Sequence, residues 1–200
     1  MRGRITYQGH ASIRLEAKTG EVIYIDPYAG DKYDLPADAV LMSHIHPDHC
    51  TIDKVTLKPD ALIVRHTDLL KDGVYQKLFL NRIGIKGVPA YNERHPKENG
   101  FVGFIIELDD VKIYIASDTS KIPEMNDLKA MSLDYAFLPC DGFYNMDVNE
   151  ASECAAIIGA KHTVPYHTCR KEEGDFSEET ALQLQANGKI ILKPGESIEL

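Results

Sequence analysis

The chain has 200 residues, of which 44% are hydrophobic and 26% are charged, a composition typical of a folded globular protein rather than a disordered one. The formal charge of −9 gives the chain no general attraction to phosphate backbones, so we expect no nucleic-acid partner. We also expect a cytoplasmic protein without membrane contact, because the sequence has neither the apolar stretch of a signal peptide nor a run of about 18 apolar residues.

The first part of the chain is predicted to be mostly β-structure. Strands are expected at 5–7, 12–17, 21–25, 39–43 and 61–65. Thr19-Gly20 lies between two of them and predicts a hairpin. The run 39–43 is continuously apolar, which indicates a strand buried on both faces. A helix is expected at 68–71.

The second part of the chain continues this style and adds helices. Strands are expected at 101–108, 111–116, 134–138, 162–166, 189–192 and 196–200. Asp109-Asp110 predicts a hairpin between the first two. Asp147 can cap a helix over 147–158, and a second helix is expected at 177–186. We therefore predict one α/β domain over residues 1–200, with two mixed sheets packed face to face and helices outside.

Four potential metal ligands lie in one short segment that directly follows the apolar strand at 39–43. His44 and His46 are two residues apart, so in an extended segment both can grip one ion. Asp48 and His49 lie beyond a turn that Pro47 helps set, and can face a second ion. Imidazole and carboxylate together suit zinc, manganese or iron. The alternative is a polar turn with coincidental histidines.

Further ligands for two ions are available at the ends of later strands. Asp118 follows the strand at 111–116, and a carboxylate there could bridge two ions about 3.5–4 Å apart. Alternatively, Asp118 is a helix cap or forms an Asx-turn. His167 follows the strand at 162–166, and could instead be a hydrogen-bonded core histidine.

Together these segments resemble the metallo-β-lactamase fold superfamily. The run 44–49, then Ser117-Asp118-Thr119, then Pro165-Tyr166-His167 occur in the order of that superfamily, and the likeness is greatest to its small metal-dependent hydrolases, which include the ascorbate-6-phosphate lactonase-like proteins. The resemblance implies a four-layer αβ/βα sandwich of two mixed β-sheets with outer helices. It also implies that Asp26 orients a ligand histidine.

The resemblance further implies which ion each residue binds. The first ion would be held by His44 and His46, the second by Asp48, His49 and His167, and Asp118 would bridge them. A further histidine is usual for the first ion, but aligned on Ala90 its position falls on Asn92. We favour His95 in this role, because imidazole is the better ligand. Ser117 is a second departure, since glycine is common there.

The cysteines leave two interpretations open. Cys50, Cys140 and Cys169 each lie within a few residues of a motif segment, and a thiolate could join the metal shell. Alternatively, they are small buried hydrophobic side chains at strand ends. No pair has the C-x-x-C spacing, so we expect free thiols.

The implied activity is metal-dependent hydrolysis. A dinuclear metal-bound hydroxide would cleave an ester, lactone or phosphodiester bond in a small anionic substrate, with two divalent ions, zinc foremost and manganese or iron as alternatives. Asp48 is the expected catalytic residue, holding the hydroxide and shuttling its proton. His10, or a polar side chain from 141–145, could bind the substrate's oxyanion. The alternatives are a di-iron oxidoreductase and a non-catalytic sensor or scaffold, and self-association into a homo-oligomer stays open.

Overall fold

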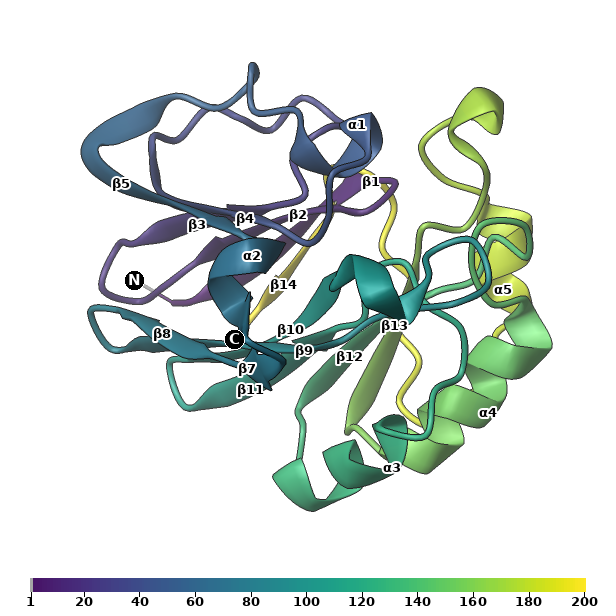
Figure 1. The fold of residues 1–200 in the computed structure, drawn as a ribbon. Coiled ribbons are helices and arrows are strands. Elements are labelled where there is room, and N and C mark those ends of the chain that lie inside the picture. Colours follow the sequence, from purple (N-terminus) through teal and green to yellow (C-terminus); the bar gives the residue numbers. More distant parts are fainter. Residues whose placement is uncertain (1) are drawn as a thin grey trace.

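A computed structural model describes residues 2–200, and two six-stranded sheets form its centre (Figure 1). The first sheet has the order β14-β1-β2-β3-β4-β5. Its strands are β1 (Arg4–Gly9), β2 (Ser12–Glu16), β3 (Val22–Ile25), β4 (Ala37–Met42), β5 (Leu57–Arg65) and β14 (Ser197–Glu199). Strands β14, β1, β2 and β3 pair antiparallel, whereas β3, β4 and β5 pair parallel, so the sheet is mixed.

The second sheet is mixed in the same way and has the order β13-β12-β11-β10-β9-β8. Its strands are β8 (Lys77–Leu80), β9 (Ile83–Pro89), β10 (Val102–Leu108), β11 (Val111–Ile115), β12 (Tyr135–Pro139) and β13 (His162–Tyr166). A small ribbon of β6 (Leu70–Lys71) and β7 (Val74–Tyr75) precedes it. Parallel pairing of β11, β12 and β13 brings their carboxyl ends to one edge of the sheet.

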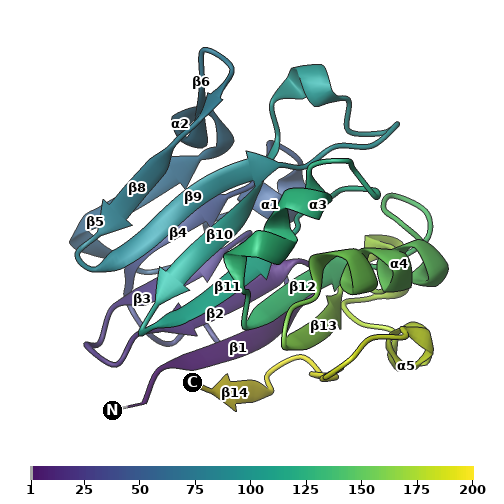
Figure 2. The ribbon, with the colours of Figure 1, turned by 90° about the horizontal axis from the view of Figure 1, so that it is seen from below.

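The sheets pack face to face over the main hydrophobic core. Ile13 and Leu41 from the first sheet and Phe104 and Phe137 from the second belong to one buried cluster. Removing such side chains from water is the main source of stability for a fold of this kind. The layers are visible from two directions in Figures 1 and 2.

Two of the helices cover the outer face of the second sheet. The helices are α1 (Pro47–Cys50), α2 (His66–Leu69), α3 (Met125–Leu128), α4 (Val148–Ile158) and α5 (Glu178–Gln183), with 3₁₀ turns at Lys97–Asn99, Lys129–Met131 and Lys171–Glu173. Figure 2 shows α3 and α4 over this sheet, where Ala151 and Cys154 pack against Tyr114 and Leu138. The outer face of the first sheet is covered mainly by irregular segments that carry Tyr33 and Ile52.

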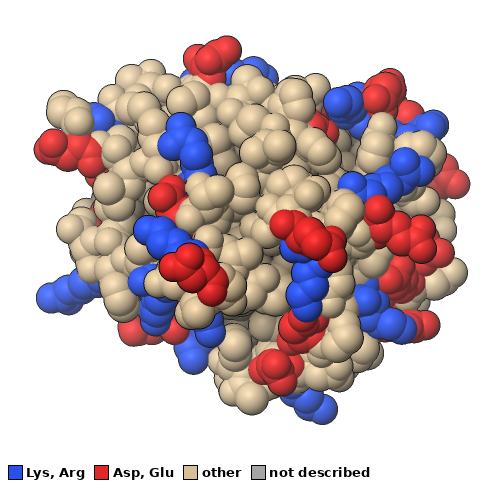
Figure 3. Space-filling view, in the orientation of Figure 1, with Lys and Arg blue, Asp and Glu red and all other residues tan. Residues whose placement is uncertain are grey.

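The expected αβ/βα sandwich of two mixed sheets is confirmed, with differences at single elements. The helix expected at 68–71 begins earlier, at His66, and residues 70–71 form β6. The strand expected at 189–192 is wrong, because that segment makes only one isolated bridge, between Lys189 and Thr163. Strands β8 and β9 were not expected. On the face shown in Figure 3, acidic and basic side chains are interspersed.

Candidate metal centre

The predicted ligands meet where strands of both sheets end. His44, His46, Asp48 and His49 follow β4 of the first sheet, while Asp118 follows β11 and His167 follows β13 of the second. His95 lies in the loop between β9 and β10. Ligands usually bind at the carboxyl ends of strands in α/β folds, and here two such edges face each other.

Three histidines form a first cluster. His44 Nε2 lies 3.1 Å from His46 Nδ1, which lies 3.3 Å from His95 Nε2. One ligand nitrogen from each residue is therefore within reach of a single ion. His44 and His95 are buried, whereas His46 is open to solvent.

A second cluster lies beside the first and contains a residue outside the predicted ligand set. Its ligand atoms come from His10, Asp48, His49 and His167. His10 is buried, and its Nε2 lies 3.2 Å from Asp48 Oδ2. Its ring centroid is 3.8 Å from that of His167. The signal in the sequence was Gly9-His10 at the end of β1, another strand end at the same edge.

Asp118 lies between the two clusters. Its Oδ1 is 3.3 Å from His49 Nε2 and 3.6 Å from His167 Nε2, and its Oδ2 is 3.5 Å from His95 Nε2. One carboxylate oxygen thus faces the second cluster and the other faces the first.

Several atoms at this point are buried without a hydrogen-bond partner. They are His49 Nε2, Asp118 Oδ1 and His167 Nε2, which point toward one another. Leaving a buried polar atom unsatisfied costs about 1–3 kcal/mol, more for a charged group. Divalent cations with nitrogen and oxygen ligands would satisfy all three atoms, so the residues present fit a metal site.

The Nδ1 atoms of four of these histidines, His44, His49, His95 and His167, face oxygen atoms. Asp26 Oδ2 accepts a hydrogen bond from His49 Nδ1 at 2.8 Å and one from the Ser43 hydroxyl at 2.6 Å. Since the Ser43 proton goes to Asp26, His44 Nδ1 donates to Ser43 Oγ, 2.9 Å away. With Nδ1 protonated, Nε2 of each ring is the free ligand atom.

Two further residues complete this pattern. Asn92 Oδ1 lies 3.0 Å from His95 Nδ1, and Asp141 Oδ2 lies 3.0 Å from His167 Nδ1. Asn92 is therefore a partner of His95 rather than a member of the cluster. Among residues 141–145 a substrate-binding side chain was expected, whereas Asp141 lies against a potential ligand; its place directly after β12 is the same signal that marks Asp118.

Burial and mutual charge shift the pKa values of the clustered groups. Burial lowers the pKa of His44 well below its usual range, and neighbouring histidines lower it further. Burial would raise the pKa of Asp118, but His49, His167 and His95 hold it below its usual range. Burial would lower the pKa of His49, yet Asp118 and Asp26 raise it to about 9. A carboxylate that stays ionised among imidazoles suits cation binding.

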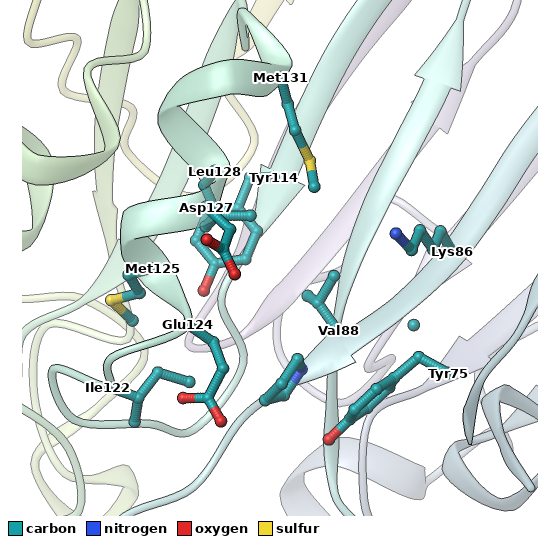
Figure 4. Close-up of a pocket in the computed structure, with 12 residues that line it drawn as sticks. Tyr75, Lys86, Val88, Tyr114, Ile122, Glu124, Met125, Asp127, Leu128 and Met131 are labelled. Carbon is teal, nitrogen blue, oxygen red and sulfur yellow. The ribbon is translucent and has the colours of Figure 1, made fainter. Parts of the chain in front are cut away.

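The cysteines and the cavity beside α3 do not add to this centre. None of the potential ligand clusters within residues 2–200 contains a cysteine, and burial raises the pKa of Cys140 to about 12, which favours the neutral thiol. A separate cavity of about 160 Å³ lies beside α3 and is lined by Val88, Tyr114 and Leu128 among others (Figure 4). It shares no residue with the clusters.

Comparison with known proteins gives the family. Residues 4–167 match the beta-lactamase superfamily domain. A UPF0173 metal-dependent hydrolase from Ligilactobacillus salivarius is 31% identical, with 82% of this chain and 84% of that protein covered. One from Pyrococcus furiosus is 29% identical, with 98% and 99% covered.

A solved structure supports the same assignment. A protein from Parabacteroides distasonis, designated a metal-dependent hydrolase, has 30% identity and a TM-score of 0.74, covering 94% of this chain and 90% of its own. Every helix among residues 2–200 is too short or too polar to span a lipid bilayer. The match over residues 4–167 and the 31% identical relative show that the chain belongs to the UPF0173 metal-dependent hydrolases of the beta-lactamase superfamily.

Proposed function

We propose that this hydrolase works with two divalent ions held side by side. The observation that carries the proposal is the position of Asp118, whose two oxygens face different clusters. The first ion would be bound by His44, His46 and His95, the second by Asp48, His49 and His167, and Asp118 would contact both. An ion pair of this kind supplies a water nucleophile of lowered pKa and a Lewis acid for the bond to be cleaved.

Asp48 has the place of a catalytic base. It belongs to the second cluster and also lines the cavity of about 290 Å³ at the mouth of the site. Burial alone would raise its pKa, but the hydrogen bond from His10 and the charge of His49 hold it well below the usual range. Asp48 therefore stays ionised, as a ligand of a cation must, and His10 holds the carboxylate in place; its position at the mouth of the site supports it as the acceptor of the water's proton.

The donor set favours hydrolysis over the alternatives. Imidazole and carboxylate suit zinc, with manganese or iron as substitutes. The clusters within residues 2–200 include no glutamate, a residue expected in the di-iron oxidoreductase alternative. The usual histidine position falls on Asn92, but His95 Nε2 lies 3.3 Å from His46 Nδ1 and can fill the role, which speaks against a sensor or scaffold with a damaged site. An ester, lactone or phosphodiester in a small anionic molecule is the proposed substrate.

Metal analysis tests the proposal. The protein, purified without chelator, is expected to hold close to two zinc or manganese ions per chain. Asp118→Ala is expected to lose both ions and His95→Ala one, while His162→Ala, away from the clusters, retains both. Hydrolysis of ester and phosphodiester substrates should follow metal content. One ion or fewer in the wild type after metal addition would exclude the dinuclear site.

A further inference from the structure

The cavity at the metal centre carries two cations beyond the potential ligands. It is lined by His46, Pro47, Asp48, Arg94, His95, Asp118, Tyr144 and Lys171. All its charged side chains other than the potential ligands are positive, namely Arg94 and Lys171. This is unexpected in a chain whose net charge is −9.

Both cations lack a protein counter-ion. Among residues 2–200, no carboxylate forms an ion pair with Arg94 or Lys171, and neither side chain donates a hydrogen bond to another protein group. Neighbouring cations differ, because Arg170 pairs with Glu173 and Lys97 with Glu124. Two unpaired cations that line one cavity attract an anion from solution.

Arg94 is also held in place. Its guanidinium carbon lies 4.3 Å from the ring centroid of Phe143 and 5.7 Å from that of Tyr144. Asn92 links the two segments, because its Oδ1 accepts a hydrogen bond from Arg94 N at 2.9 Å and its Nδ2 donates to Tyr144 O at 2.9 Å. Stacking holds the plane of a guanidinium and leaves its N–H groups available for a bidentate partner.

A second hollow adjoins the first. A groove of about 700 Å³ is also lined by Arg94 and Tyr144, and these two residues therefore stand between the metal centre and the groove. A substrate that extends from the metal centre toward the groove would pass Arg94.

We propose that Arg94 and Lys171 bind a carboxylate or phosphoryl group of the substrate, located away from the bond that is cleaved. This inference rests on the proposed function, and it specifies the substrate class. The substrate has two parts, a hydrolysable group that reaches the ions and a separate anion that reaches the two cations. The anion would accept charge-assisted hydrogen bonds from Arg94 and Lys171, and such bonds are about twice as strong as neutral ones.

Calorimetric binding to the metal-loaded protein tests the proposal without relying on turnover. Glutarate and 4-phosphonobutyrate carry a second anion, whereas butyrate has one carboxylate only. We expect wild type to bind at least one dianion about 10-fold or more tighter than butyrate. Arg94→Gln/Lys171→Gln should lose that preference and keep its affinity for butyrate and its metal content. The dianion with the larger loss identifies the group that is recognised.

A matched control separates a local effect from net charge. Arg82→Gln/Lys129→Gln removes the same charge from two exposed side chains that do not line this cavity, and it should retain the preference. The proposal is overturned if wild type binds dianions and butyrate alike, or if the Arg94/Lys171 variant keeps the preference. In either case, two bound ions per chain and hydrolysis that follows metal content would leave the proposed dinuclear mechanism standing. A wild type without ions would overturn both.

Discussion

Four residues that border the metal centre have backbone conformations that side chains other than glycine rarely adopt. The φ angles are +49° for His10, +45° for Asp26, +59° for Ser117 and +44° for His167. Each residue follows a strand, so the sharp change of direction turns its side chain or its neighbour's toward the site. Such strain persists only where the surrounding structure enforces it, and it concentrates at functional sites.

Ser117 offers a direct test of this strain. Its hydroxyl is buried without a partner, so Ser117→Gly removes both a strained Cβ and an unsatisfied polar atom. We expect the free energy of unfolding to rise by about 1 kcal/mol, measured by urea denaturation. Ser120→Gly, at a position without positive φ, should not stabilise. A loss of stability in the Ser117 variant would contradict the expectation.

Substitution of Asn92 tests whether this side chain fixes the orientation of the His95 ring. Without its Oδ1, the His95 ring is free to turn and Nε2 no longer faces the cluster. We expect Asn92→Ala to weaken metal binding at the first site by about 10–100-fold, measured by competition with a chelator. Asn92→Asp keeps the acceptor and should bind metal more tightly than Asn92→Ala. Equal affinity in all three proteins would show that Asn92 has no such role.

At the scale of elements, the sequence was sufficient to predict the features whose residues lie close together in the chain. The hairpin at 109–110 was predicted from its two aspartates, and both adopt positive φ, the conformation that such turns require. Helix α4 was predicted from Asp147, whose Oδ1 accepts a hydrogen bond from Glu150 N at 2.9 Å. The ligand segment 44–49 was recognisable because all its members are local.

Strand β9 and the loop after it were not predictable from the sequence, because tertiary packing determines their structure. Strand β9 contains Gly84 and Gly87, which weaken a strand prediction, yet a Cβ at Gly87 would lie 2.8 Å from Leu69 Cβ, so α2 packs directly on this glycine. The choice between Asn92 and His95 likewise depended on how the loop folds. In the folded loop, His95 Nε2 faces the first cluster, and Asn92 Oδ1 lies next to His95 Nδ1.

Helix α4 is predicted to depend on its N-terminal cap. Asp147→Ala removes the side chain that accepts from Glu150 N, and we expect a loss of about 1 kcal/mol in the free energy of unfolding, measured by urea denaturation. Asp127→Ala, at an exposed position in the first turn of α3, removes no such bond and should change stability by less. Equal effects of the two substitutions would rule out the cap as the cause.

At the scale of the whole molecule, bound ions would join the two sheets. Residues 44–49 extend from the first sheet, whereas Asp118 and His167 extend from the second. Because only the folded chain brings the full set of proposed ligands together, we expect chelation to lower the melting temperature by about 10 °C or more, from about 4 kcal/mol of binding linkage at saturating metal. Asp118→Ala should melt at one temperature with or without chelator. A wild type insensitive to chelation would show that the ions contribute little to stability.

The division of the proposed ligands between the two sheets also predicts an order of metal binding during folding. The segment 44–49 carries three histidines and Asp48 before any of the second sheet exists, so a nascent chain can already capture an ion there. That ion lacks the carboxylate of Asp118 and the rings of His95 and His167 until the halves close. With the proposed ligands, metal affinity is therefore expected to rise stepwise during folding, and the fully ligated state would mark a chain whose two halves have completed their packing.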